Sequence, residues 1–332
     1  MIARRLRVDG HIGWVKEVER ACSKLDPSDI DVILVSGSPF VAFRLAKKIS
    51  DRIGRPYVLD YRDPWTGNPH ASRLPRPETI REEADLVQGC AAVTIVSPSW
   101  GENLDRRYGI GVKCHVITNG YDADEMAAVT SCDFGHCAIV YTGNFYPPKR
   151  IISPFLAALK RLAESPNETS NEWYFHYYGA QESHVRELAV QYGLKDRIIF
   201  HGRVTREEAL SAVKGARLAV VLVSIEEQSS PEMAGMVPAK IYEAIGLGTP
   251  VLLIAPNGSD ASRVTASTGL VKSFTANDTH GMASYLRAVI RGEVPKSKNI
   301  DAFSWQEIGR NLDGVLRQVE SSNVRAQRFG HE

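Results

Sequence analysis

The chain has 332 residues, of which 43% are hydrophobic and 24% are charged, and its formal net charge at pH 7 is +1. This length predicts two domains that each bury a core. The near-zero charge gives no support for a nucleic-acid-binding protein or for a broadly cationic membrane surface. No apolar run is long enough to span a membrane, and no signal-peptide core follows Met1. Five cysteines, scattered and odd in number, are typical of reduced thiols, so we expect a cytoplasmic protein.

Several classes of site lack their sequence signature. Cys132 and Cys137 flank His136, but no second ligand pair follows at zinc-finger spacing, so we expect no metal site. The phosphate-binding glycine patterns of dinucleotide oxidoreductases and P-loop proteins are absent from the sequence. A Ser-His-Asp triad would have no nucleophile elbow to carry it.

Apolar strand candidates alternate with helical segments along most of the chain, which predicts parallel sheets with helices on both faces. The first part has four predicted strands and the second part has six. The strands are expected at residues 31–36, 57–61, 92–97 and 114–118, and then at 138–142, 173–178, 197–201, 217–223, 251–254 and 270–273. The helices are expected at residues 15–25, 40–53, 79–89 and 100–108, and then at 152–164, 182–192, 205–214, 238–247, 260–266 and 278–291.

A turn-rich stretch without periodicity at 119–135 separates the two parts and suits an interdomain linker. We therefore predict one domain at 1–125, a linker at 126–137 and a second domain at 138–300. Residues 301–332 are expected to form a last amphipathic helix, from Phe303-Ser-Trp305 to about Glu320, and then a frayed tail at 321–332.

Residues 236–254 are predicted to form a helix followed by a strand, with a candidate anion-binding site at the helix start. Pro238 suits the first position of a helix, and the apolar run 251–254 suits a buried parallel strand. A flexible loop at 229–237 before the helix start would leave backbone N–H groups free to bind an anion, phosphate above all. Lys240 and Glu243 lie on one face near that end. A solvated helix face is the alternative interpretation of this pair.

Pro238-Ala-Lys-Ile-Tyr-Glu243, followed by Gly248-Thr-Pro-Val, resembles the nucleotide-sugar motif of retaining glycosyltransferases of the GT-B fold, in the large family usually numbered four. The resemblance implies an α/β fold of two Rossmann-like doubly wound domains, with a last helix that crosses back to the first. It implies that Glu243 holds the donor ribose, while Gly235, Met236, Val237 and Lys240 lie at the diphosphate. The family usually has a second glutamate at the place of Gly235, although one sub-branch lacks it.

Two further loops in the second half resemble donor-binding loops of this family. Gly143-Asn144 follows a strand, and Lys149-Arg150 precedes a helix; the resemblance implies that Arg150, beside Lys149, neutralises the diphosphate. The alternative is a surface pair at a helix start. Gly202-Arg203-Val204 resembles the base-binding turn, whose contacts are mostly made by the backbone. His201 before it would more often be a packed or solvent-edge histidine.

In the first domain, Arg62-Asp63 ends a predicted strand, and we take these two residues as the catalytic candidates. The Asp63 carboxylate could accept a proton from an acceptor hydroxyl or orient the sugar. The alternative is an Asp–Arg pair that braces the loop. Compared with the family, we expect a reduced first domain, because the opening strand and glycine-rich acceptor loop would precede Met1. A chain without that loop is expected to bind donor but to transfer sugar slowly.

The resemblance thus implies a hexosyl- or related glycosyltransferase that works with retention, without an essential metal or cofactor. Its partners would be a nucleotide-diphosphate sugar and a glycan, lipid-linked or small-molecule acceptor, as in polysaccharide biosynthesis, and no nucleic acid. Peripheral contact with the inner membrane face stays open, as does a homo-oligomer or partner that covers the reduced domain. The alternatives are a non-catalytic nucleotide-sugar-binding homologue or partner subunit, and an epimerase or phosphorylase on the same fold.

Overall fold

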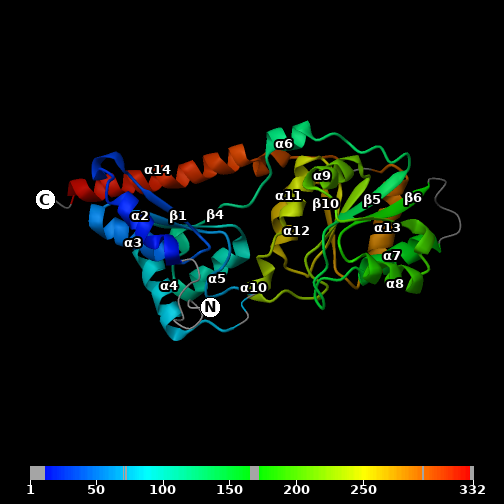
Figure 1. Ribbon diagram of the computed structural model, residues 1–332, viewed down its shortest axis with the longest axis horizontal. Coiled ribbons are helices and arrows are strands. Elements are labelled where there is room, and N and C mark those ends of the chain that lie inside the picture. Colours follow the sequence, from blue (N-terminus) through cyan, green and yellow to red (C-terminus); the bar gives the residue numbers. More distant parts are fainter. Residues whose placement is uncertain (1–11, 70, 72, 165–171, 294, 330–332) are drawn as a thin grey trace. The chain divides into compact units, whose positions relative to one another are not determined.

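The computed structural model describes residues 12–69, 71, 73–164, 172–293 and 295–329 (Figure 1). The chain divides into two compact units. Unit 1 comprises Met1–Thr118 and Ile308–Glu332, and unit 2 comprises Asn119–Glu307. The stretch 126–137, for which the sequence predicts a linker, lies in unit 2 and begins inside a short helix, α6 (Ala123–Ala128), that the sequence analysis did not expect.

Unit 1 is built on the predicted four-stranded parallel sheet, in the order β1-β2-β3-β4. Proline begins α4 and α5, where its missing N–H costs nothing, and Gly54 and Gly109 end α3 and α5 in the left-handed conformation. The strands are β1 (Ile33–Gly37), β2 (Tyr57–Tyr61), β3 (Ala92–Ile95) and β4 (Cys114–Val116). The helices are α2 (Val15–Cys22), α3 (Val41–Ile53), α4 (Pro77–Gly89) and α5 (Pro98–Tyr108), with 3-10 turns at Ile12–Trp14, Pro27–Asp29 and Gly111–Lys113.

The last helix, α14 (Trp305–Phe329), begins in unit 2 and continues into unit 1. In unit 1 its Val315 and Val319 are buried in one cluster with Val58 of β2 and Ala92 of β3. The expectation of a frayed tail from residue 321 is wrong as far as 329; residues 330–332 lie outside the described part. A helix that has already formed extends at little cost, even through residues of weak helix propensity.

Unit 2 contains the predicted six-stranded parallel sheet, in the order β10-β9-β8-β5-β6-β7. Its strands are β5 (Cys137–Thr142), β6 (Trp173–Tyr178), β7 (Ile198–Gly202), β8 (Leu218–Leu222), β9 (Val251–Ile254) and β10 (Val271–Phe274). The strand order reverses between β5 and β8, which places a topological switch point at their carboxyl ends. Ligands of doubly wound sheets bind at such a point.

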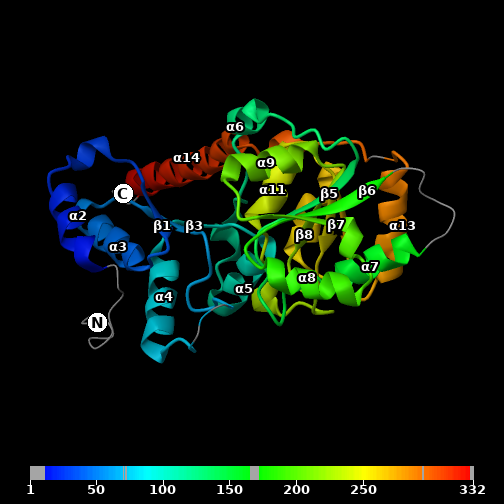
Figure 2. The ribbon, with the colours of Figure 1, turned by 45° about the vertical axis from the view of Figure 1, so that its right-hand side comes forward.

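Helices cover both faces of this sheet, as the alternating pattern predicts. One core lies under α7 (Ser153–Ala163), α8 (Glu182–Gln191) and α13 (Thr279–Ile290), and the other under α9 (Arg206–Gly215), α11 (Ala239–Gly246) and α12 (Asp260–Thr265). Both views show α9 and α11 side by side (Figure 1 and Figure 2). The remaining elements are a short helix, α10 (Pro231–Ala234), and 3-10 turns at Lys195–Arg197, Ala266–Thr268 and Ile300–Phe303.

Two details of unit 2 differ from the sequence prediction. The loop expected to be flexible at 229–237 contains α10, which Ser230 caps. Pro238 lies one position before the first residue of α11 rather than on it. In the described part of the chain, no helix is long and apolar enough to cross a membrane. All five cysteines are free thiols.

Three histidines form a hydrogen-bonded row on one face of the unit 2 sheet. His176 on β6 is 2% exposed, and its Nδ1 and Nε2 lie 2.9 Å from His201 Nε2 and His136 Nε2. Phe134 packs on His176, and Tyr178 stacks on His201 with ring centroids 3.9 Å apart. Burial and the two neighbouring imidazoles lower the pKa of His176 to about 4. His201 itself is exposed, which agrees with the interpretation of a packed or solvent-edge histidine.

This row predicts sensitivity of the fold to acid. A histidine whose pKa is lower in the folded than in the unfolded chain is protonated first in the unfolded chain, so the free energy of unfolding should fall as the pH drops from 6.5 towards 4. We expect the urea midpoint to decrease over this range and the decrease to be smaller in His176→Phe, which keeps an aromatic ring. Replacing the exposed His184 by Gln serves as the control. An equal acid dependence in wild type and His176→Phe would contradict the prediction.

Candidate functional site

The carboxyl end of β5 makes a close approach to the start of α11. Gly143 follows β5 with φ of +121°, and its N–H donates to the Tyr178 carbonyl at 2.7 Å. The Lys240 ammonium group donates to the Thr142 carbonyl, and a Cβ atom at position 143 would collide with Lys240 Nζ. The backbone conformation therefore favours glycine here, and a side chain at this position would displace the Lys240 ammonium group.

Lys240 is the second residue of α11 and half-buried. Burial lowers its pKa, the positive charge of Arg150 lowers it further, and Glu243 acts in the opposite direction. The Nζ atom lies 5.4 Å from the ring centroid of Tyr141, a distance suited to a cation–π contact. Two cations therefore share this end of the sheet at a cost in free energy that an anion would relieve.

Arg150 lies beside Lys240, and its partners in the described part of the chain carry no charge. Its Nε donates to the Val223 carbonyl at 3.4 Å, its Nη2 lies 3.0 Å from Met236 Sδ, and its guanidinium lies 5.3 Å from the Tyr146 ring centroid. Two backbone hydrogen bonds between Tyr146 and Arg150, of 2.8 and 3.0 Å, fix the loop that carries it. Among the described residues, the guanidinium is thus held in place without a carboxylate bonded to it.

The neighbours of Arg150 in sequence have other contacts. Lys149 is exposed and forms an ion pair of 3.0 Å with Glu226, which offsets its charge. Asn144 joins two loops, because its Oδ1 accepts a hydrogen bond from the Ala180 N–H at 3.2 Å. The structure therefore separates the two basic residues that the sequence places side by side.

The segment before α11 is ordered by packing. Met236 and Val237 pack against the core under α9 and α11. Gly235 ends α10 with φ of −75°, a conformation that any residue adopts. The backbone conformation therefore does not require glycine at position 235, which is buried.

Glu243, one turn after Lys240, forms an ion pair with Arg206, the first residue of α9. The same guanidinium forms two bonds of 3.0 Å to the Glu125 carboxylate on α6. Sequence reasoning missed Arg206 and Glu125, although the capping pattern Thr205-x-x-Glu208 does mark where α9 begins. A cavity of about 50 Å³ is lined by Lys240, Glu243, Arg206 and apolar residues of β5, β8 and α9.

The candidate base-binding turn follows β7, the edge strand of the described sheet. Gly202 has φ of +67° and allows the chain to turn out of the strand. Arg203 is exposed, while Val204 packs against the core under α9. The turn thus leads from the histidine row directly to the start of α9, where Arg206 lies.

In unit 1, the catalytic candidates Arg62 and Asp63 directly follow β2 and are exposed. The Arg62 N–H donates to the Gly37 carbonyl at 3.1 Å, which ties this loop to the end of β1. Two residues further on, Trp65 stacks on Phe40 with centroids 5.1 Å apart and an interplanar angle of 8°. The loop is therefore anchored close to both candidates.

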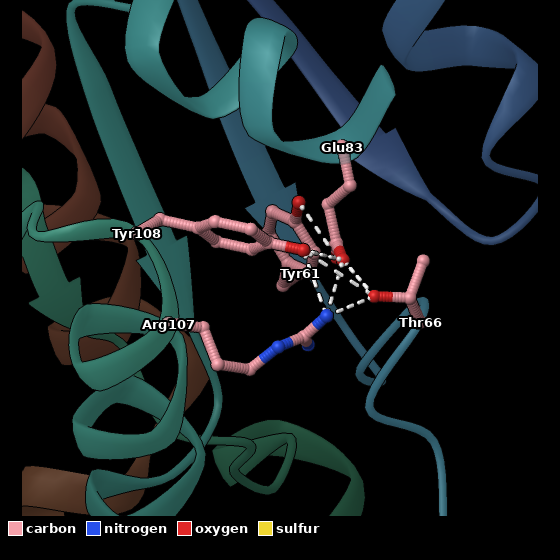
Figure 3. A network of polar contacts seen from close by, with 5 residues as sticks. All are labelled: Tyr61, Thr66, Glu83, Arg107 and Tyr108. Atoms are coloured by element: carbon pink, nitrogen blue, oxygen red, sulfur yellow. Dashed lines mark hydrogen bonds and ion pairs between the residues drawn. The ribbon is translucent and has the colours of Figure 1, made fainter. Parts of the chain in front are cut away.

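A buried network holds the next part of this loop (Figure 3). The Glu83 carboxylate on α4 is fully buried and accepts hydrogen bonds from Tyr108 Oη at 2.7 Å, from Tyr61 Oη at 3.3 Å and from the Thr66 hydroxyl, while Arg107 Nη2 lies 3.4 Å away. Burial raises the pKa of Tyr108 to about 12, so its hydroxyl remains a donor at neutral pH. Sequence reasoning missed this network, because no local spacing links its members.

The described part of the chain contains no group of three or more His, Cys, Asp or Glu side chains arranged to hold a metal ion. The histidine row illustrates the reason, since both ring nitrogens of His176 already face another imidazole at 2.9 Å. Lys240 and Arg150 place two cations at the carboxyl end of β5, beside the Glu243 carboxylate, and two such cations suit an anionic ligand.

Comparisons with known proteins agree with this arrangement. Residues 4–125 match the family model described as Glycosyltransferase Family 4, and residues 136–291 match the one described as Glycosyl transferases group 1. A search of curated proteins gave no match.

Several solved structures share the fold. The lipopolysaccharide outer core galactosyltransferase WaaB in its apo form is 14% identical with a TM-score of 0.62, over 91% of this chain and 79% of that one. Sucrose-phosphate synthase from Thermosynechococcus elongatus is 16% identical with a TM-score of 0.61, over 93% and 78% of the two chains. Anabaena Alr3699/HepE in complex with UDP is 15% identical with a TM-score of 0.60, over 96% and 82%.

At these identities the solved structures establish the fold, and the two family models extend over most of both units. The four-stranded and six-stranded parallel sheets, each flanked by helices, are the two Rossmann-like domains of that fold. The chain belongs to the glycosyltransferases of the GT-B fold.

Proposed function

We propose that this protein transfers a sugar from a nucleotide-diphosphate sugar to a glycan, lipid-linked or small-molecule acceptor, with retention and without an essential metal. The observation that carries the proposal is the pair of cations, Arg150 and Lys240, at the carboxyl end of β5. Backbone carbonyls and the Met236 sulfur hold them there, and these groups carry no charge. Similar structures of Anabaena Alr3699/HepE in complex with UDP and with UDP-glucose support a nucleotide-sugar donor.

In this proposal the diphosphate lies against Arg150 and Lys240, close to the first turn of α11. Charge that develops on the leaving diphosphate is stabilised by groups already in place, which is the largest contribution that a site of this kind can make. Gly143 leaves room for close approach. Glu243 accepts hydrogen bonds from the ribose hydroxyls, and Gly202, Arg203 and Val204 face the base.

We further propose that Asp63, with Arg62 beside it, acts on the acceptor from unit 1. The anchors at Trp65 and Thr66 support this role, because a carboxylate that handles a proton must be held at a defined position. The five free thiols support a cytoplasmic location.

A second candidate function is nucleotide-sugar binding without turnover. Gly235 favours it, because this residue stands where the resemblance places a sugar-contacting glutamate, and its φ does not require glycine. The two functions differ in one measurement. Release of nucleoside diphosphate from a bound donor, dependent on acceptor, is expected only of a transferase.

The first test of the donor site is Glu243→Ala. Loss of a charged acceptor for the ribose hydroxyls should weaken binding of the preferred nucleoside diphosphate by roughly 1.5–3 kcal/mol, or about tenfold or more. Calorimetry with UDP, GDP and ADP would identify that ligand and measure the loss. Glu164→Ala, on the exposed side of unit 2 beyond α7, is the matched control. Unchanged affinity in folded Glu243→Ala would remove this residue from the site.

A second test concerns phosphate recognition by Arg150. Arg150→Ala should weaken the nucleoside diphosphate about tenfold or more and leave the free nucleoside nearly unchanged, because only the former carries charge. Arg150→Lys should restore part of the loss, since it keeps the charge without the paired geometry. Lys149→Ala should have a smaller effect, because Glu226 already offsets that charge. Equal losses for nucleoside and diphosphate would assign Arg150 to the fold alone.

A third test separates chemistry from binding in unit 1. Asp63→Asn keeps the shape of the side chain but cannot accept a proton, so turnover of the best donor should fall by about 10²-fold or more. Calorimetric affinity for the nucleoside diphosphate should stay the same. If Asp63→Asn instead turned over donor at the wild-type rate, this carboxylate would have no part in the reaction.

A further inference from the structure

The contacts of Arg206 are asymmetric. Its Nε and Nη2 both bond to the Glu125 carboxylate, at 3.0 Å each, and its Nη1 donates to Glu243 Oε1. A guanidinium held by two parallel bonds has a fixed plane, so the direction of its third nitrogen is fixed as well. Glu125 therefore determines where Arg206 points, and Arg206 in turn determines where one oxygen of Glu243 lies.

We propose that Arg206 is a positioning residue for the donor site: braced by Glu125, it holds the Glu243 carboxylate in the orientation that receives the ribose. This inference rests on the proposed function, in which Glu243 contacts the nucleotide. It adds two residues, one on α6 and one on α9, that neither the sequence motif nor the family match assigns.

The ion pair with Arg206 leaves hydrogen-bond acceptor positions on the Glu243 carboxylate. A carboxylate has two oxygens and about four acceptor positions, and Arg206 contacts only Oε1. Oε2 remains for ribose hydroxyls while the ion pair is intact. The nucleotide therefore need not displace Arg206, and the bound carboxylate loses less rotational freedom when the ligand arrives.

The positive charge of Arg206 also supports a role in nucleotide binding. A nucleoside diphosphate carries negative charge close to Glu243, and an uncompensated carboxylate there would oppose its binding. The Arg206 guanidinium offsets that charge, and both carboxylates raise the pKa of Arg206, so it stays protonated at any working pH. Glu125 is the larger cause of this increase.

Stability does not account for the trio. The side chain of Arg206 is 56% exposed and that of Glu125 is 42% exposed, and ion pairs at such exposure contribute little to folding. The start of α9 is fixed independently by the capping box of Thr205 and Glu208. Removing Arg206 should therefore leave a folded chain, which makes the inference testable by binding.

The test is a double-mutant cycle on the full chain, measured by calorimetry with the nucleoside diphosphate that wild type prefers among UDP, GDP and ADP. We expect Arg206→Ala to weaken binding about five- to tenfold, and Glu125→Gln to weaken it less, because Arg206 keeps its charge but loses its brace. In a Glu243→Ala background, Arg206→Ala should change affinity by less than about twofold. Lys160→Ala, which removes an exposed paired cation on α7, is the charge-matched control.

Each outcome decides a different question. Equal effects of Arg206→Ala with and without Glu243 would mean that Arg206 acts elsewhere, and would overturn the inference alone. Tighter binding by Arg206→Ala would also overturn it, because Arg206 would then compete with the ribose for Glu243. No binding of any of the three nucleoside diphosphates by wild type would overturn the proposed function and this inference with it. A lysine at position 206 should restore affinity only in part, since it cannot bond to both carboxylates in one plane.

Discussion

The contact between Lys240 and the end of β5 is the constraint on which the candidate site of unit 2 depends. Lys240 reaches the Thr142 carbonyl across the space that a side chain at position 143 would fill. This contact brings the first turn of α11 against the loop that carries Arg150. It also concentrates positive charge where the strand order of the sheet reverses, the position at which doubly wound sheets bind their ligands. The topological switch point and the two cations therefore lie at the same end of the sheet.

The sequence predicted those parts of the fold that local chemistry determines. The run 251–254 forms β9 with every residue buried, as expected of a central parallel strand, and all ten predicted strands are present within a few residues. The short helix α10 was missed, because four residues are too few to show periodicity. The end of α14 was missed because Ser321, Ser322 and Asn323 indicate a helix end by propensity, whereas an established helix continues through them.

In the candidate site too, residues in short sequence motifs could be predicted, whereas contacts between residues far apart in the sequence could not. Gly143, Arg150, Lys240 and Glu243 could be proposed from the sequence because each lies in a short motif beside a strand or helix end. Arg206 and Glu125 are 81 residues apart and meet only through the packing of α6 and α9, so no spacing in the sequence could indicate their contact. The Glu83 network has the same origin, since its members come from β2, the following loop, α4 and α5.

Glu83 and Glu243 differ in burial and in the number of hydrogen-bond donors on their carboxylates, and these differences suit different roles. Glu83 is fully buried, and hydroxyl donors from three other residues reach both its oxygens, so its carboxylate is closed to a ligand from solvent. Such a group fixes a loop, because any other arrangement would leave a buried charge without partners. Glu243 retains 23% exposure and a free oxygen, and its partner reaches it from an exposed position. Such a carboxylate has a fixed orientation and keeps acceptor positions, which is what the proposed contact with the ribose hydroxyls would require.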